Sequence, residues 1–135
     1  MLERSCGTIP YTLRDGKILY LLVQAGDDGY CGFPKGHMEG GETEAETAYR
    51  ETWEETSLQV RVDKGFRYEI FYSMRNGNRK KVVYFPGEFS GQTPCHNQGF
   101  ERFRYLLLPF EEACEALTFE NARAMLKKAN AYLTK

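Results

Sequence analysis

The segment that most constrains the fold starts at Thr43. The spacing Thr43-x-x-Glu46 is that of a capping box, in which the threonine hydroxyl and the glutamate carboxylate accept hydrogen bonds from N–H groups that are otherwise unpaired at the start of a helix. Small side chains then recur every three or four residues and offer one face for packing: Ala45, Ala48 and Thr52. We therefore predict a helix that runs to about Ser57 and packs this face against another element.

Two strand patterns precede this helix. They cover residues 5–13 and 17–25, and a turn at Arg14-Asp15-Gly16 joins them. Residues 18–23 are almost wholly apolar, which is typical of a strand covered on both faces.

Further strands and two helices are predicted after it. The strand patterns lie at residues 58–62, 66–74, 81–89 and 102–108, with a hairpin turn at Asn76-Gly77 and a loop over residues 91–99. Pro109 suits the first turn of a helix that runs through residue 117, and residues 119–133 carry one apolar stripe. Strands with interleaved helices predict an α/β fold, a mixed β-sheet sandwiched between α-helices.

Composition and charge narrow the class of protein. A chain of 135 residues has the size of one ordinary domain, and its formal net charge of -1 gives no reason to expect a nucleic acid or an anionic membrane as partner. No apolar run reaches the length of about 20 residues that a membrane span needs.

The four cysteines show neither a C-x-x-C pair nor zinc-site spacing: Cys6, Cys31, Cys95 and Cys114. We expect reduced thiols and a cytoplasmic protein, either a monomer or a small homo-oligomer.

Three carboxylates share one face of the predicted helix. Glu51, Glu54 and Glu55 stand at positions i, i+3 and i+4, where like charges repel by about 0.2–0.5 kcal/mol per pair. A hard divalent cation such as Mg²⁺ or Mn²⁺ would relieve this repulsion. A solvated acidic helix face has the same pattern, so the cluster alone does not decide between these interpretations.

The residues around the cluster favour a metal site. The stretch Gly36-x5-Glu42-x7-Arg50-Glu51-Thr52-x-Glu54-Glu55-x-Ser57-Leu58 resembles the Nudix box, and seven of the nine specified positions match, including every charged one. Thr52 stands where the family has a bulky aliphatic residue, and Ser57 replaces the glycine that ends the helix, where a left-handed C-cap is one option. The resemblance covers essentially the whole chain and implies a single Nudix domain over residues 1–135, with the box at 36–58.

The resemblance implies a role for each charged position. Glu54 and Glu55 would be the principal metal ligands, with Glu51 a further ligand or the base that activates water. The carbonyl of Gly36 would complete the site, Arg50 would orient a carboxylate, and Glu42 would brace the loop against the helix. The implied reaction is hydrolysis of a phosphoanhydride with Mg²⁺ or Mn²⁺ as cofactor.

Residues outside the box indicate the substrate. The segment from Pro34 to Glu39 resembles the lead-in of the asymmetrical diadenosine tetraphosphate hydrolases, and also that of the diphosphoinositol polyphosphate phosphohydrolases. It would turn Lys35 and His37 towards a polyphosphate chain. A plain loop histidine is the alternative for His37.

Three further segments resemble the dinucleotide hydrolases. Lys80 or Lys81 would reach phosphate, with Tyr84 of the same strand near a base and Tyr72 as a second tyrosine. Ordinary packing in a half-buried sheet explains these tyrosines equally well, and a solvated hairpin end explains the lysines. Glu101, in the pattern Glu101-x3-Tyr105, would be an extra metal ligand or the base, whereas Leu107 stands where that family commonly has tryptophan.

The leading hypothesis is hydrolysis of diadenosine tetraphosphate to ATP and AMP. The alternatives within enzymes are a nucleoside triphosphate pyrophosphatase, an inositol pyrophosphate phosphatase and an RNA-end pyrophosphohydrolase. A non-catalytic nucleotide sensor is the alternative of another class, and it normally goes with a damaged acidic cluster, whereas all three glutamates are present here.

Overall fold

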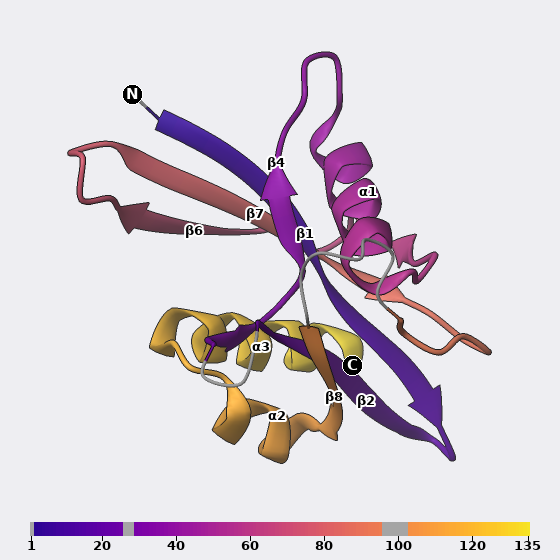
Figure 1. The fold of residues 1–135 in the computed structure, drawn as a ribbon. Helices are drawn as coiled ribbons and strands as arrows, with labels where there is room; N and C mark the ends of the chain where they lie inside the picture. Colours follow the sequence, from indigo (N-terminus) through magenta and orange to yellow (C-terminus); the bar gives the residue numbers. More distant parts are fainter. Residues whose placement is uncertain (1, 26–28, 96–102) are drawn as a thin grey trace.

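A mixed β-sheet lies at the centre of the structure, a computed structural model that describes residues 2–25, 29–95 and 103–135 (Figure 1). Within these residues the sheet has eight strands in the order β3-β2-β1-β7-β5, with β4 beside β1, β6 beside β7 and β8 beside β2. The strands are β1 (Leu2–Arg14), β2 (Lys17–Ala25), β3 (Cys31–Gly32), β4 (Lys35–His37), β5 (Arg61–Val62), β6 (Tyr68–Ser73), β7 (Arg79–Glu88) and β8 (Phe103–Pro109). β1 pairs parallel with β7 and antiparallel with β2 and β4, which makes the sheet mixed.

Helices cover both faces of this sheet. α1 (Glu44–Thr56) packs on one face, where its Ala48 joins a buried cluster with Cys6 and Val83. α2 (Phe110–Ala116) and α3 (Glu120–Leu133) cover the opposite face, where Met125 and Leu126 pack with strand residues such as Val82. The prediction of an α/β sheet sandwiched between helices is confirmed (Figure 1).

The ends of α1 are formed as the local sequence predicts. Thr43 Oγ1 accepts from the N–H of Glu46 at 3.1 Å, and the Glu46 carboxylate accepts from the N–H of Thr43 at 2.8 Å. Ser57 has φ 62° and ψ 11°, so it is a left-handed C-cap, and its N–H donates to the carbonyl of Trp53 at 2.8 Å. Both end signals are confirmed.

Several predicted boundaries are wrong for tertiary reasons. Of residues 58–62, only Arg61–Val62 forms a strand, because the N–H and carbonyl of Gln59 bond to the side chain of Gln92 at 2.7 and 3.0 Å instead of to a neighbouring strand. The strand predicted from residue 66 begins at Tyr68, and Pro109 is the N-cap of α2 rather than a residue of its first turn. The short strands β3 and β4 were not predicted, because they form only where β2 and β1 lie beside them.

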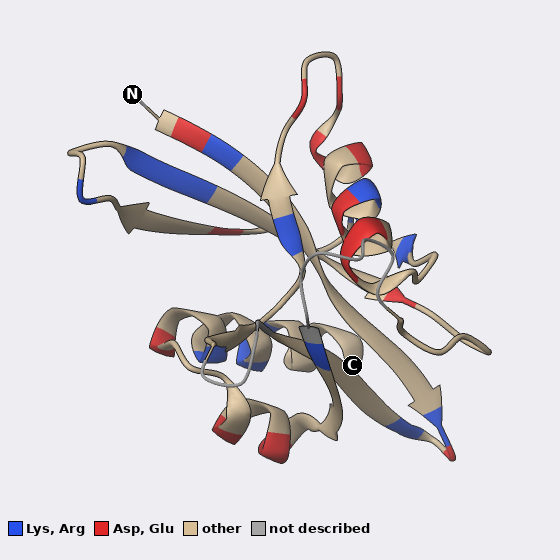
Figure 2. Ribbon diagram, viewed as in Figure 1, with Lys and Arg blue, Asp and Glu red and all other residues tan. Residues whose placement is uncertain are grey.

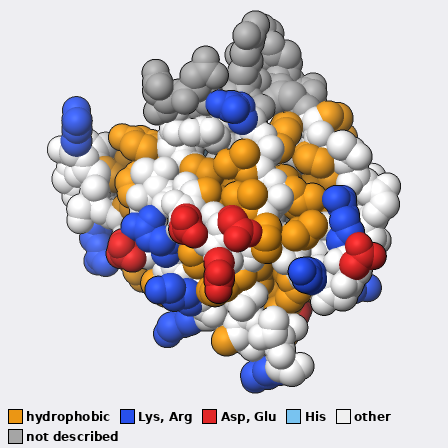
Figure 3. All heavy atoms as spheres, turned by 90° about the horizontal axis from the view of Figure 1, so that it is seen from below, with side chains coloured by type: hydrophobic (Ala, Val, Ile, Leu, Met, Phe, Trp, Pro, Cys, Tyr) orange, Lys and Arg blue, Asp and Glu red, His pale blue; other side chains and the backbone are white. Residues whose placement is uncertain are grey.

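The surface carries charges of both signs. Figure 2 shows acidic residues on α1 and on the loop before it, with basic residues on β4 and at the start of β7. Seen from below, the molecule exposes hydrophobic side chains among acidic and basic ones (Figure 3). No helix in the described part of the chain is both long and apolar enough to cross a membrane. All four cysteines are free thiols.

Candidate active site

Gly36 brings the backbone of β4 directly against α1. It pairs with Cys6 of β1, and a Cβ atom added at Gly36 would lie 2.0 Å from Cδ and 2.1 Å from Oε1 of Glu51. A side chain at this position would fit only if the end of the Glu51 side chain moved aside, since ordinary contacts begin at 3.4 Å. The box glycine and the first box carboxylate therefore form one tightly packed unit.

Arg50 binds three of the carboxylates around it. Its Nε and Nη2 donate to the two carboxylate oxygens of Glu42 at 2.6 and 3.0 Å. Its Nη1 donates to Glu51 at 2.8 Å and to Glu54 at 3.2 Å, and Nη2 also reaches the carbonyl of His37 at 3.0 Å. One guanidinium thus joins the loop after β4 to the acidic face of α1.

The pKa values of Glu42 and Glu51 are shifted in opposite directions. The Arg50 guanidinium lowers the pKa of Glu42 to about 2. Burial raises the pKa of Glu51, against the opposing effect of Arg50. Glu42 is therefore a fixed anion in the brace, whereas Glu51 lies in a drier environment beside Gly36.

The candidate ligands are oxygen atoms, which suit a hard cation, but those in the described residues do not point towards one common position. Within the described residues, no three acidic, histidine or cysteine side chains come close enough together to hold a metal ion. Glu51 and Glu54 are turned towards Arg50, and Glu55 lines a neighbouring cavity. Carboxylate oxygens and a backbone carbonyl are still the ligands that a cation such as Mg²⁺ prefers. Glu101, the further predicted ligand, lies outside the described residues.

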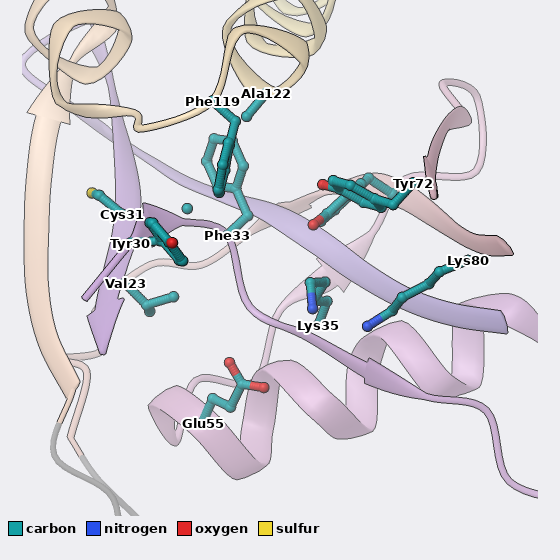
Figure 4. A pocket seen from close by; sticks show the side chains of 12 residues that line it. Val23, Tyr30, Cys31, Phe33, Lys35, Glu55, Tyr72, Lys80, Phe119 and Ala122 are labelled. Carbon is teal, nitrogen blue, oxygen red and sulfur yellow. The ribbon is translucent and has the colours of Figure 1, made fainter. Parts of the chain in front are cut away.

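A cavity of about 420 Å³ opens beside this acidic face (Figure 4). One end is polar and is formed by Lys35, Lys80 and Glu55. The remaining walls are mostly aromatic and come from distant parts of the chain: Tyr30, Phe33, Tyr72, Tyr84 and Phe119. A large apolar cavity with a few charged groups at one end is the usual form of a small-molecule site.

The two lysines at the polar end contact each other. Burial lowers the pKa of Lys35, and the adjacent ammonium group of Lys80 lowers it further, while Glu55 and Glu51 oppose this effect. Figure 4 shows both amino groups on the side of the cavity that faces Glu55. A pair of like charges in contact favours binding of an anion between or beside them.

Strand register decides which predicted lysine reaches the cavity. Lys80 pairs with Tyr72 across β6 and β7 and lines the cavity, whereas Lys81 pairs with Phe71 on the opposite face of the sheet. There the Lys81 ammonium lies 3.7 Å from Glu69. Of the two candidates, the structure brings only Lys80 to the cavity, because adjacent residues of a strand point to opposite faces.

His37, the predicted phosphate contact, does not line the cavity. His37 pairs with Ser5 of β1 and its side chain is exposed, outside the cavity wall. Its contact with the charged cluster is through its carbonyl, which accepts from Arg50.

The two predicted tyrosines are both core residues and cavity walls. Tyr84 is only 4% exposed, and its ring meets Phe33 edge-on with 6.3 Å between the centroids. Tyr72 is half-buried, packs against the same core and shares the cavity with it. The packing interpretation is therefore confirmed, and both rings also form part of the cavity wall, whereas their contact with a base stays a prediction.

The sequence did not reveal the aromatic residues at the other side of the cavity. The rings of Tyr30 and Phe119 lie 5.0 Å apart. The N–H of Cys31 donates to Thr118 Oγ1 at 2.8 Å, and the N–H of Thr118 donates to the Cys31 carbonyl at 3.1 Å. These contacts join segments that are almost 90 residues apart, so no local sequence pattern could predict them.

One further contact fixes the end of α1. The hydroxyl of Tyr105, on β8, donates to the carbonyl of Glu55 at 2.6 Å. Leu107, two residues on, packs with the cluster that contains Leu21 and Leu58 and does not line the cavity.

Both the sequence and the fold resemble those of known proteins. The sequence matches the family model of the NUDIX domain over residues 1–129. The chain belongs to the Nudix family. Among its relatives is the asymmetrical bis(5'-nucleosyl)-tetraphosphatase of Mus musculus, which is 34% identical over 143 residues that cover 98% of this chain and 97% of the other. The relative of the same name from Caenorhabditis elegans is 27% identical and covers 98% of both chains.

Solved structures of this Nudix family agree with the fold. A binary complex of the C. elegans Ap4A hydrolase superposes with a TM-score of 0.88 at 26% identity and covers 98% of both chains. A Nudix domain from Shewanella oneidensis, complexed with ADP ribose, has a TM-score of 0.79 at 16% identity, covers 98% of this chain and 89% of the other, and supports the fold alone. Nudix hydrolases generally need a divalent metal, which agrees with the acidic face of α1.

Proposed function

We propose that this Nudix protein hydrolyses diadenosine tetraphosphate to ATP and AMP. The observation that carries the proposal is the cavity in which aromatic walls lead to Lys35 and Lys80, with Glu55 of the box at the same end. Aromatic rings stack on a base, and lysine ammonium groups bind phosphate as point charges. A nucleotide with its base in the cavity would therefore extend its phosphates towards the acidic face of α1. The mouse and nematode relatives carry the name of this activity.

We assign the metal to the acidic face of α1. Mg²⁺, or Mn²⁺ in its place, would be held by the carbonyl of Gly36 and by the carboxylates of Glu51, Glu54, Glu55 and Glu101. When bound, this ion supplies positive charge that offsets the charge of the polyphosphate and of the leaving oxygen. Arg50 orients Glu51 and Glu54, and Glu42 holds Arg50 in place.

The chain's own groups would divide the remaining work. Lys35 and Lys80 hold phosphate oxygens, and Tyr72, Tyr84 and Phe119 enclose the base. A water molecule attacks one phosphorus atom, the bridging P–O bond breaks, and the proton of the water passes to a carboxylate, either Glu51 or Glu101. His37 remains a proposed phosphate contact at the exposed rim.

Other properties belong to the same proposal. We propose that residues 1–135 act as one Nudix domain, as a monomer or a small homo-oligomer, without a nucleic-acid or membrane partner. The four free cysteines support a cytoplasmic compartment, where thiols stay reduced.

A substrate panel tests the proposed activity. The protein is incubated with Mg²⁺ and, in separate reactions, diadenosine tetraphosphate, nucleoside triphosphates, an inositol pyrophosphate and RNA with a 5'-triphosphate, and products are separated by ion exchange. We expect equal amounts of ATP and AMP from the first substrate, and loss of turnover in Glu54→Gln. Turnover of a triphosphate with the dinucleotide untouched would overturn the substrate but not the family. Tight nucleotide binding without turnover on any phosphoanhydride would favour the sensor.

A further inference from the structure

A buried pair of threonine hydroxyls joins α1 to β1 at the back of the proposed metal site. Thr52 lies on α1 between Glu51 and Glu54, where the Nudix box has an aliphatic residue. Thr8 lies on β1, and both threonines are completely buried. Their hydroxyl oxygens are 2.6 Å apart, which is a short hydrogen bond between residues 44 positions apart.

The protons of this pair have one consistent arrangement. Each threonine hydroxyl carries one proton, and that of Thr52 is donated to the carbonyl of Ala48 at 2.8 Å. Thr8 must then donate to Thr52. Removing the hydroxyl of Thr52 would leave a buried donor on Thr8 without an acceptor, which is the costly kind of deletion.

Thr8 also holds the other half of the site. Its backbone N–H donates to the carbonyl of Pro34 at 3.2 Å, two residues before Gly36. The strand that carries Gly36 and the helix that carries Glu51 are thus both attached to the same residue. A Cβ atom at Gly36 would lie 2.0 Å from Cδ of Glu51, so the backbone of this strand and the end of the Glu51 side chain lie directly against each other.

We propose that the Thr8–Thr52 pair is a positioning element for the metal-binding carboxylates. The pair sets where α1 lies on β1, and through this it sets the distance between the carboxylates of α1 and the carbonyl of Gly36. Thr52 does not itself touch metal or substrate. The inference rests on the metal site of the proposed function, and it assigns a role to the position at which this chain departs from the family motif.

The test compares metal binding with stability in matched variants. Mn²⁺ affinity is measured by titration calorimetry without substrate, and Tm by thermal unfolding without metal. We expect Thr52→Val to bind Mn²⁺ about tenfold more weakly, the low end of the range for residues that support metal ligands. Thr52→Ser, which keeps the hydroxyl, should bind like the wild type. The double variant Thr8→Val with Thr52→Val should recover affinity and Tm, because an apolar pair leaves no buried donor unpaired.

Thr56→Val is the matched control. Thr56 is also completely buried on α1, but among the described residues its hydroxyl bonds to the carbonyl of Thr52 at 2.6 Å and the N–H of Leu58 at 3.2 Å, and not to β1. We expect this variant to lower Tm and leave Mn²⁺ affinity unchanged. If Thr52→Val lowers Tm in the same way and binds Mn²⁺ like the wild type, the pair is merely structural and the inference is refuted. A wild-type protein that binds no Mn²⁺ would instead overturn the proposed metal site together with this inference.

Discussion

Substitution of Gly36 by alanine should separate catalysis from folding. The added Cβ would lie 2.0 Å from Cδ of Glu51, whereas ordinary contacts begin at 3.4 Å. Either the carboxylate or the β4 backbone must therefore move by more than about 1 Å, and a displacement of that size at a reacting group costs roughly 10²-fold in rate. Because the atoms that the added Cβ meets are the end of a flexible side chain, the fold itself should lose little stability.

The assay measures kcat/KM for diadenosine tetraphosphate with Mg²⁺, alongside Tm. We expect kcat/KM of Gly36→Ala to fall by roughly 10²-fold while the protein remains folded at the assay temperature. Gly40→Ala is the control, because a Cβ atom at this loop glycine meets nothing within 4 Å. A Gly36→Ala variant as active as Gly40→Ala would refute the reasoning that Gly36 and Glu51 form one tightly packed part of the active site.

Three other predictions concern the phosphates, the base and the brace. Lys80→Ala should raise KM by about tenfold or more, since a hydrogen bond to a charged group contributes about 1.5–3 kcal/mol, whereas Lys81→Ala, on the opposite face of the sheet, should leave KM unchanged in steady-state assays. Phe119→Ala should weaken AMP binding by about 1–3 kcal/mol in calorimetry if its ring stacks on the base, and unchanged affinity would remove it from the site. Glu42 has a pKa lowered to about 2 from 4.5, so its bond to Arg50 stabilises the fold fully above pH 4.5 and loses this effect as the pH falls towards 2. Urea denaturation at several pH values should therefore show a shallower acid loss of stability in Glu42→Gln, and identical profiles would contradict the prediction.

Local signals predicted the helix that carries the site. The capping box at Thr43, the left-handed residue Ser57 and the turn at Asn76-Gly77, where Gly77 has φ 84°, are all confirmed. Each depends on hydrogen bonds or backbone angles within about four residues, which the sequence contains in full.

Long-range contacts explain the strand errors. Gln92 lies 33 residues beyond Gln59, yet its side chain takes the hydrogen bonds that a neighbouring strand would have taken. The same limit applies to Thr52, whose polar partner is Thr8 on a distant strand. A pattern read along the chain shows that Thr52 departs from the motif but not what compensates for it.

The sequence alone determined that Glu51, Glu54 and Glu55 share one helix face behind a glycine-containing loop, because helix geometry and motif spacing are local. Only the tertiary structure decided which groups accompany them. Residues 82–85 are apolar at every position and buried on both faces, so alternation along β7 cannot tell whether Lys80 or Lys81 faces the cavity. That choice, and the meeting of Tyr30 with Phe119, depend on the register of the sheet and on the packing of α3, and both are set by contacts between residues far apart in the chain.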